Sequence, residues 1–562
     1  MKVLLTAVNS KYIHSNLAVR YLKQFTSELD YECTIREFSI NDRIENILEE
    51  IMLEKADVVA FSCYIWNMEY INRLAELIKL VNDKIQILYG GPEVSFDCEN
   101  FLKEHVGEFL ITGEGEETYK EFIEYKLERR KLETIRGLYY KTENDVKFNG
   151  FRPQIDMNNL VFPYTMDDNS IENKIVYYEA SRGCPFRCKY CLSSTIEGVR
   201  FLNVERVKKE LKYFMDKGVR LVKFVDRTFN CNHNFAKEIW KYLMEQNTNT
   251  TFHFEISADI LRDDEIELLS KAPYGRFQFE VGVQTTNDEV LANINRHISF
   301  NDIKGRVSKI AQRGNIKQHL DLIAGLPGED FQSFKKSFND VHSIGPEEIQ
   351  LGFLKLLKGS SMREEALKWG IVYSPYAPYE ILRSKDISYE ELLQLKKAEE
   401  MVDKYYNSGK FNNIIKFFNH KFETPFDFYF ELGSFFEKKG YFKRNIGNVE
   451  YYKVFLDFNE EKLNSENQEA LKEIIKYDYL CFNKKKWLPD FLIRDLDKNE
   501  ERRIKDSIKE QYDSNNYHIE KFRLDINKYI SDSGIKFSPS YFIFDVKNPN
   551  NIISITEYEQ IN

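Results

Sequence analysis

Several features that would define other protein classes are scarce or absent in this sequence. Eight cysteines in 562 residues are too few and too scattered for a disulfide framework. No apolar run reaches the ~20 residues that a membrane span needs, and residues 1–8 enter a strand-like run without a signal-peptide cleavage region. The formal net charge of −10 argues against nucleic acid as a general partner. These absences predict a cytoplasmic protein without a membrane segment.

What is present is the composition of a large globular protein. Apolar residues make up 42% of the chain and charged residues 30%, which are ordinary values. A length of 562 residues allows three or four domains with large cores. The patterns described below divide the chain into residues 1–135, 136–174, 175–365 and 366–562.

In residues 1–135, apolar strand-like runs alternate with helical stretches. The expected strands cover residues 3–8, 33–38, 57–62, 85–89 and 108–112, and helices with apolar spacing near 3.6 include 17–29 and 68–81. This alternation predicts an α/β fold with a doubly wound parallel sheet. Ligands of such sheets bind at the carboxyl ends of the strands.

The loops after these strands carry glycines and hydroxyl side chains. Glycine lets the backbone approach a ligand closely, and a hydroxyl can hydrogen-bond to its polar edges. No G-x-G-x-x-G follows the first strand, so a dinucleotide is not predicted. Each loop taken alone could equally be a tight turn. The candidate ligand contacts are Ser62, Tyr64, Gly90, Gly91, Gly113, Glu114 and Gly115.

Three cysteines, Cys184, Cys188 and Cys191, are grouped at C-x-x-x-C-x-x-C spacing. Gaps of four and three residues are expected to let the three thiolates converge on one point. Three sulfurs leave one iron of a four-iron cluster without a protein ligand. The alternatives are a zinc site or buried structural cysteines, but zinc sites usually need a fourth ligand at set spacing, and the next candidates are the distant Cys231 and His233.

Residues 175–365 resume the strand–helix alternation behind the cysteine loop. Strand candidates are residues 221–226, 251–257, 277–283, 318–324 and 349–354. About six such units predict a partial (β/α)6 barrel with its chemistry at the carboxyl ends of the strands. Residues 136–174 are interpreted as a connector that includes a hairpin-like piece, 137–141.

Residues 366–562 are rich in Lys, Glu, Asn, Phe and Tyr and are predicted to form a mainly helical α+β domain. Amphipathic patterns predict helices within 389–418 and over 426–438, and a strand over 541–546. The basic run at 484–487 is interpreted as an exposed turn. This region contains no recognisable catalytic motif.

The cysteine spacing, the barrel pattern and the G-G-P-E and G-E-G-E loops at 90–93 and 113–116 resemble the cobalamin-binding subclass of the radical S-adenosylmethionine (radical SAM) superfamily. The resemblance covers roughly the first 380 residues. It implies that a 4Fe–4S cluster chelates S-adenosylmethionine and cleaves it to a 5′-deoxyadenosyl radical. It also implies cobalamin as a cofactor of the first domain. The chain departs from the D-x-H-x-x-G signature of cobalamin proteins, because Asn9 and His14 do not fit its spacing.

The resemblance also implies which residues contact S-adenosylmethionine. They are Phe186, Tyr190, Asp226, Glu255, Ser257, Gln284, Arg296 and Leu326. An arginine suits the carboxylate of the ligand because it can pair with it bidentately. For Asp226, Glu255 and Arg296, a salt bridge at the rim of the barrel is an equal alternative.

The resemblance implies an enzyme, most simply one that methylates an unactivated carbon of a small-molecule or peptide substrate. The cofactors carry such chemistry, and the protein supplies placement and shielding. The alternatives are a cobalamin-dependent cyclase or rearrangement catalyst, a methylthiotransferase that uses Cys33, Cys63 and Cys98 for a second cluster, and a non-catalytic iron–sulfur sensor. A flavodoxin or ferredoxin is the expected electron donor, under oxygen-poor conditions.

Overall fold

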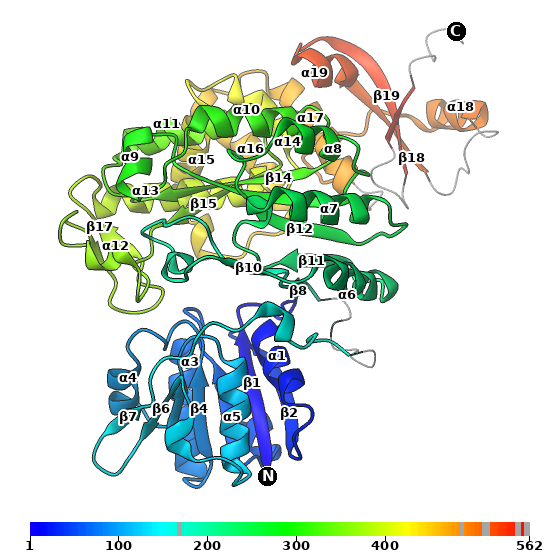
Figure 1. The fold of residues 1–562 in the computed structure, drawn as a ribbon. Coiled ribbons are helices and arrows are strands. Elements are labelled where there is room, and N and C mark those ends of the chain that lie inside the picture. Colours follow the sequence, from blue (N-terminus) through cyan, green and yellow to red (C-terminus); the bar gives the residue numbers. More distant parts are fainter. Residues whose placement is uncertain (166–170, 172–173, 484–487, 509–516, 546–551, 556–562) are drawn as a thin grey trace. The chain divides into compact units, whose positions relative to one another are not determined.

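The computed structural model describes residues 1–165, 171, 174–483, 488–508, 517–545 and 552–555 (Figure 1). The chain forms two units. The first comprises Met1–Phe334 and Gly352–Tyr389, and the second comprises Lys335–Leu351 and Glu390–Asn562. In the described part of the chain, no helix has both the length and the apolar character needed to cross a bilayer.

The first unit begins with a seven-stranded sheet of order β2-β1-β3-β4-β5-β6-β7 (Figure 1, blue to cyan). Its strands are β1 (Lys2–Asn9), β2 (Glu32–Ser39), β3 (Val58–Ser62), β4 (Gln86–Gly90), β5 (Phe109–Ile111), β6 (Leu138–Lys141) and β7 (Val146–Phe148). The first five strands pair in parallel. The last two are added antiparallel at one edge.

Helices cover both faces of this sheet. Alternate residues of β1 point to opposite sides, so Leu4 and Val8 join one hydrophobic cluster and Val3 and Leu5 join the other. The first cluster includes α2 (Ile44–Leu53), α3 (Met68–Val81) and α4 (Cys98–Glu104), and the second includes α1 (Leu17–Phe25) and α5 (Glu116–Lys126). The predicted doubly wound α/β sheet is therefore confirmed.

The hairpin that the sequence suggests for the connector is part of this sheet. Its first strand, β6, pairs antiparallel with β5, with Tyr140 opposite Phe109. Leu138 and Tyr140 are buried in the same cluster as Phe109. The hairpin adds to the sheet because its apolar side chains complete that cluster.

A six-stranded sheet of order β15-β14-β13-β12-β11-β8 follows in the chain (Figure 1, green). Its strands are β8 (Val176–Tyr178), β11 (Leu221–Phe224), β12 (Thr251–Ile256), β13 (Phe277–Gln284), β14 (Lys317–Ala324) and β15 (Glu348–Phe353). The strands β8 to β14 of this sheet lie in the first unit, whereas most of β15 belongs to the second. The helices between them are α6 (Val204–Asp216), α7 (His233–Met244), α8 (Asp263–Leu269), α9 (Asp288–Asn293), α10 (Phe300–Ala311) and α11 (Phe331–His342). This order is that of the predicted (β/α)6 barrel.

The side of this sheet that packs against helices is apolar and aromatic. Phe224, Phe254 and Phe279 come from three neighbouring strands and are fully buried. The indole of Trp240 on α7 contacts the last two rings, at centroid distances of 6.4 and 5.7 Å. The opposite side carries polar residues, which are described below. Short elements complete the first unit: β9 (Ser181–Gly183), β10 (Val199–Phe201), α12 (Ser361–Glu364), β16 (Val372–Tyr373) and β17 (Ile381–Arg383).

The second unit is mainly helical. Its helices are α13 (Tyr389–Met401), α14 (Asn412–Asn419), α15 (Pro425–Lys438), α16 (Asn448–Leu463), α17 (Gln468–Phe482), α18 (Lys498–Ile508) and α19 (Ile526–Asp532). A three-stranded antiparallel sheet contains β18 (Tyr517–Leu524), β19 (Phe537–Asp545) and β20 (Ile552–Ser554). This agrees with the predicted helical α+β region. The basic run at 484–487 lies outside the described residues.

Local sequence explains the boundaries and packing of these helices. Thr424 and Asp427 form a capping box at the start of α15, and Pro425 occupies its first turn. The phenylalanines of the region fill the core, where the rings of Phe418 and Phe428 stack at 5.2 Å. The high aromatic content therefore serves packing in this unit.

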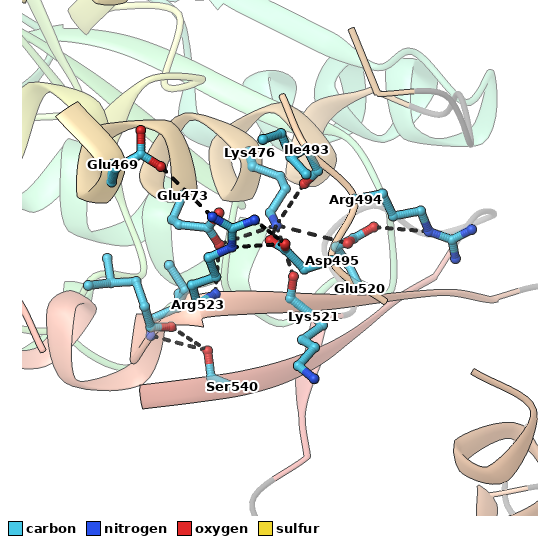
Figure 2. A network of polar contacts seen from close by, with 12 residues as sticks. Glu469, Glu473, Lys476, Ile493, Arg494, Asp495, Glu520, Lys521, Arg523 and Ser540 are labelled. Atoms are coloured by element: carbon cyan, nitrogen blue, oxygen red, sulfur yellow. Dashed lines mark hydrogen bonds and ion pairs between the residues drawn. The ribbon is translucent and has the colours of Figure 1, made fainter. Parts of the chain in front are cut away.

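A buried lysine joins the last long helix of the bundle to the sheet (Figure 2). The ammonium of Lys476 on α17 lies 3.2 Å from Glu473, 3.5 Å from Asp495 and 3.9 Å from Glu520. It also donates to the carbonyl oxygens of Ile493 and Lys521. Only 1% of the lysine side chain is exposed, so these partners take the place of its hydration shell.

Candidate functional site

The cysteine motif lies in a loop between β9 and β10, and we call residues 181–201 the cysteine hairpin. The two strands pair antiparallel, with Gly183 opposite Val199. Gly183 has φ +107°, and a Cβ placed there would lie 2.2 Å from the carbonyl oxygen of Gly198. Only glycine lets the two backbones approach this closely, so Gly183 fixes the point from which the cysteines project.

The three cysteines lie near one another within this loop. Burial raises the pKa of the Cys188 thiol, the Arg296 guanidinium opposes that shift, and Cys191 and Cys184 add to it. Arg296 donates to the sulfur of Cys188 at 3.7 Å, and the sulfur of Cys184 lies 3.5 Å from the Thr228 hydroxyl. The thiols are therefore grouped beside a cationic donor.

The residues present fit a four-iron cluster. Each thiolate of such a cluster binds a different iron, so three thiols grouped in one loop can serve three irons and leave the fourth open. The convergence of the three thiolates that the spacing predicts remains a prediction.

Asp226, a predicted S-adenosylmethionine contact, holds the start of the cysteine hairpin through its carboxylate. One oxygen accepts from the backbone N–H of Ala180 at 3.0 Å, and the other accepts from the Ser181 hydroxyl at 2.5 Å. Only 1% of Asp226 is exposed, and this burial raises its pKa to about 7. Both of its oxygens are thus committed to the protein.

Other expected contacts lie at the carboxyl ends of the barrel strands. The Nη2 atom of Arg296 donates to the carbonyl oxygen of Gly282 at 2.6 Å. Gln284 has φ +71°, and its amide nitrogen would lie 2.1 Å from a Cβ at Gly282. Glycine at 282 thus leaves room for the Gln284 side chain beside Arg296.

The remaining expected contacts have the following places. Burial raises the pKa of Glu255, which lies 4.0 Å from Arg227. Ser257 donates from its hydroxyl to Asp259 at 2.5 Å. Leu326 is fully buried, whereas Phe186 and Tyr190 in the cysteine loop are partly exposed.

The polar side of the barrel contains ionisable residues that are not among the predicted ligand contacts. Lys223 on β11 and His253 on β12 lie 3.0 and 2.9 Å from the same carboxylate oxygen of Glu280 on β13. Burial opposes ionisation of Glu280, but these two partners outweigh it and lower its pKa. Asp321 on β14 has a raised pKa through burial and through Glu280 and Glu255.

A signal for this set was present in the strands. In β13 the polar side chains are at 278, 280 and 284, and β14 carries His319 and Asp321 two residues apart. Parallel pairing places Glu280 opposite His319 and Gly282 opposite Asp321. An inward side of a barrel is usually apolar. Period-two polarity in strands that are otherwise aromatic therefore indicates a lumen built for polar ligands.

The expected cobalamin contacts lie in loops at the carboxyl edge of the first sheet. The Ser62 hydroxyl accepts from the Asn16 amide at 3.2 Å. The Tyr64 ring stacks on Trp66 at a centroid distance of 4.5 Å. Burial raises the pKa of the Tyr64 hydroxyl to about 12. At Gly91, with φ +120°, a Cβ would lie 2.5 Å from the carbonyl oxygen of Cys63.

The glycines and Glu114 of this edge differ in their surroundings. Gly113, with φ +74°, has open space where a side chain would project. Gly90 ends β4, and Gly115 is the N-cap of α5. Glu114 lies between Gly113 and Gly115, and its carboxylate is paired with Arg200 of the cysteine hairpin.

The loop after β1 connects the first sheet to the barrel. The N–H of Ile175, just before β8, donates to the carbonyl oxygen of Ile13 at 2.8 Å. His14 Nδ1 lies 2.7 Å from the hydroxyl of Tyr177 on β8. Burial lowers the pKa of His14, and Lys11 and Lys223 lower it further. This histidine therefore faces the barrel.

Comparison with protein-family models identifies the families to which these domains belong. Residues 3–123 match the B12 binding domain, and residues 178–341 match the radical SAM superfamily. The chain is a radical SAM protein with a B12-binding domain. Residues 367–551 of this radical SAM protein match a family described as a protein of unknown function, DUF4080.

Relatives of this radical SAM protein match about half of it at low identity. An uncharacterized methyltransferase, PH0819, of Pyrococcus horikoshii is 24% identical over 52% of this chain and 66% of its own length. The cobalamin-dependent radical SAM methyltransferase TokK of Streptomyces tokunonensis is 24% identical over 53% of this chain and 47% of its own length. This chain therefore spans about half to two thirds of these curated relatives.

A solved structure shows the same fold. It is that of the radical S-adenosylmethionine methyltransferase TsrM from Kitasatospora setae with cobalamin and a [4Fe-4S] cluster bound. The likeness has a TM-score of 0.55 at 15% identity and covers 67% of this chain and 82% of that one. At this identity the comparison supports the fold alone.

Proposed function

We propose that this radical SAM protein is a cobalamin-dependent methyltransferase that acts on an unactivated carbon of a small molecule or peptide. The observation that carries the proposal is the three-cysteine loop beside Arg296, at the carboxyl ends of a barrel whose first strand is bonded to the loop after β1 of the B12-binding sheet. The relatives PH0819 and TokK, both named as methyltransferases, support methyl transfer.

In this proposal Cys184, Cys188 and Cys191 hold a 4Fe–4S cluster and leave one iron open. When bound, the cluster, S-adenosylmethionine and cobalamin supply reductive cleavage and the methyl group. Arg296 keeps a positive charge beside Cys188, which favours the thiolate over the thiol. The apolar side of the barrel strands keeps the loop on a rigid support.

We further propose that Glu255, Ser257, Gln284 and Arg296 contact S-adenosylmethionine, with Phe186, Tyr190 and Leu326 beside its adenine. Arg296 can direct its guanidinium to the ligand carboxylate while it donates to Gly282. The B12-binding loops would hold cobalamin through Ser62, Tyr64, Gly90, Gly91, Gly113 and Gly115. His14 does not fit the D-x-H-x-x-G spacing and is turned toward Tyr177, which argues against it as a ligand of the cobalt.

The polar lumen supports a hydrophilic substrate. Lys223, His253 and Glu280 form a hydrogen-bonded group whose burial against a purely apolar ligand would be costly. A flavodoxin or ferredoxin is the proposed electron donor. The cytoplasm is the proposed location, because the eight cysteines are all free and the cluster needs reduced thiols.

The methylthiotransferase alternative lacks support in the first sheet. Burial raises the pKa of Cys33, Cys63 and Cys98. Cys63 and Cys98 are buried in one hydrophobic cluster, and Cys33 packs against the other. These cysteines therefore serve packing rather than a second cluster.

Methyl transfer from labelled S-adenosylmethionine tests the proposal. The protein, loaded with iron, sulfide and cobalamin without oxygen, is incubated with reductant, trideuteromethyl S-adenosylmethionine and a metabolite extract. We expect 5′-deoxyadenosine and a trideuteromethylated product by mass spectrometry. Deoxyadenosine without such a product would instead favour the cyclase or rearrangement alternative.

Cysteine variants provide the controls for this experiment. Replacing Cys184, Cys188 or Cys191 with alanine should abolish both products, because each variant removes a cluster ligand. Cys231→Ala is the matched control, since Cys231 lies nearby but outside the motif. A normal cluster in any of the three motif variants would contradict the assignment.

A further inference from the structure

Five charged residues form a network at the base of the cysteine hairpin, and we call them the hairpin clamp. They are Glu114, Glu116, Glu179, Arg182 and Arg200. Arg182 donates to both oxygens of Glu179 at 2.9 Å and to Glu116 at 2.8 Å. Arg200 donates to both oxygens of Glu114, and Arg182 also lies 3.5 Å from Glu114.

The clamp joins two segments that are far apart in sequence. Glu114 lies in the loop between β5 and α5, and Glu116 is the first residue of α5, at the carboxyl edge of the B12-binding sheet. Arg182 and Arg200 face each other across β9 and β10, two residues before Cys184 and nine after Cys191. The same edge that presents the B12-binding loops therefore holds both strands of the cysteine hairpin.

Burial makes this connection costly to break. The exposed fraction is 14% for Arg182, 8% for Glu116 and 12% for Glu179. Charges at this depth persist only when they are paired and hydrogen-bonded. The planar fork of Arg182 meets the Glu179 carboxylate with two donors, which fixes its orientation. The clamp therefore has one strongly preferred geometry.

Both carboxylate oxygens of Glu114 are committed within the clamp. One accepts from Arg200 and from the backbone N–H of Ile155 at 2.9 Å, and the other faces Arg182 and Arg200. The arginines outweigh the effect of burial and lower the pKa of Glu114, so it remains ionised. It is better placed to hold the hairpin than to bind a corrin.

We propose that Glu114 and Glu116 are positioning residues which, through Arg182 and Arg200, set the cysteine loop at a fixed distance from the B12-binding edge. This inference rests on the proposed function, because it concerns the spacing of the two cofactors. Radical chemistry depends on such placement, and a displacement of about 1 Å can cost 10²-fold in rate.

Electron paramagnetic resonance tests the inference on the fully loaded protein. The probe is the magnetic interaction between the reduced cluster and cob(II)alamin, which depends on their separation. We expect Arg182→Gln and the double variant E114Q/E116Q to weaken or broaden this interaction at unchanged iron, sulfide and cobalamin content. Arg130→Gln, which removes a pair with Glu121 and Glu124 on α5, is the matched control and should match the wild type.

An unchanged interaction in both clamp variants would overturn the inference while leaving the proposed function intact. A wild-type protein that binds no cluster or no cobalamin would instead refute the proposed function. If the wild type binds no cluster or cobalamin, or if a variant binds them poorly, amide exchange of the apoprotein tests the clamp. Residues 181–201 should exchange about tenfold faster in the clamp variants but not in Arg130→Gln. Equal exchange would refute the clamp.

Discussion

His342 is a largely buried histidine at the carboxyl end of α11. A helix carboxyl end favours a protonated histidine, but burial outweighs this effect and lowers its pKa to about 4. The rings of Phe338, Tyr406 and Tyr429 surround it at 5.3 to 6.2 Å. The folded state therefore holds this histidine neutral where the unfolded chain would protonate it.

This difference predicts acid destabilisation of the second unit. Because the unfolded state binds the proton more readily, stability is lost as the pH falls from about 6.5 to about 4, by on the order of 3 kcal/mol. Amide exchange of helices α14 to α17, measured across this range, should show the loss. His342→Phe should remove most of it, and His297→Gln, at an exposed position, should not. An equal loss of stability in His342→Phe and in the wild type over this pH range would show that His342 is not its cause.

Single residues also show where sequence reasoning is strong. The cysteine motif is local, so its spacing predicts Cys184, Cys188 and Cys191 without knowledge of the fold. The partners of Asp226 and Glu114 are not local, since they lie 45 and 86 residues away. A carboxylate that follows a strand looks the same in sequence whether it meets a ligand or an arginine, and only the fold decides.

At the scale of elements, the cysteine hairpin depends on two glycines with different surroundings. Gly183 and Gly198 both have positive φ, at +107° and +70°. A Cβ at 183 would meet the carbonyl oxygen of Gly198 at 2.2 Å, whereas a Cβ at 198 has nothing within 4 Å. The two positions therefore share one kind of backbone strain and differ in steric contact.

The prediction is that Gly183→Ala prevents cluster assembly and Gly198→Ala does not. The first substitution forces β9 and β10 apart, while the second costs only about 1 kcal/mol of left-handed strain. Iron and sulfide content after anaerobic reconstitution measures the outcome. Equal cluster content in the two variants would show that the close approach at Gly183 is not needed.

Sequence patterns predict elements correctly where the pattern is local and incompletely where the partners are distant in sequence. The strands of both sheets appear as apolar runs, and their alternation with helices predicts parallel pairing. The hairpin at Leu138–Phe148 looks like part of a connector because its partner strand, β5, ends 27 residues earlier. The polar side of the barrel was present as period-two polarity but needed the strand register to be recognised.

At the scale of the molecule, the second unit includes a segment that comes from within the barrel sequence. Residues 335–351 belong to it although the barrel strand β14 precedes them. Phe338 packs against Phe426 and Tyr429 at ring distances of 5.6 and 5.8 Å. A division into consecutive segments at 135, 174 and 365 cannot represent a segment of the barrel sequence that belongs to another unit. The predicted domain boundaries remain a prediction.

The Lys476 network is a buried polar connection between the helices and the sheet of that unit (Figure 2). Lys476→Met leaves Glu473, Asp495 and Glu520 without their shared cation, and we expect a loss of about 3–5 kcal/mol. Urea-dependent amide exchange in α17 and β18 measures it. Lys462→Met, which removes a pair with Glu431 whose side chains are 34% and 36% exposed, should cost less than about 1 kcal/mol. Similar losses would show that burial of the network is unimportant.

The central claim is that one chain holds a three-cysteine cluster and a cobalamin. The most direct test is anaerobic reconstitution with iron, sulfide and hydroxocobalamin, followed by gel filtration and an absorption spectrum of the protein fraction. We predict about four irons and one cobalamin per chain, with the iron lost in Cys184→Ala. A protein that assembles its cluster but leaves cobalamin in solution would contradict the account.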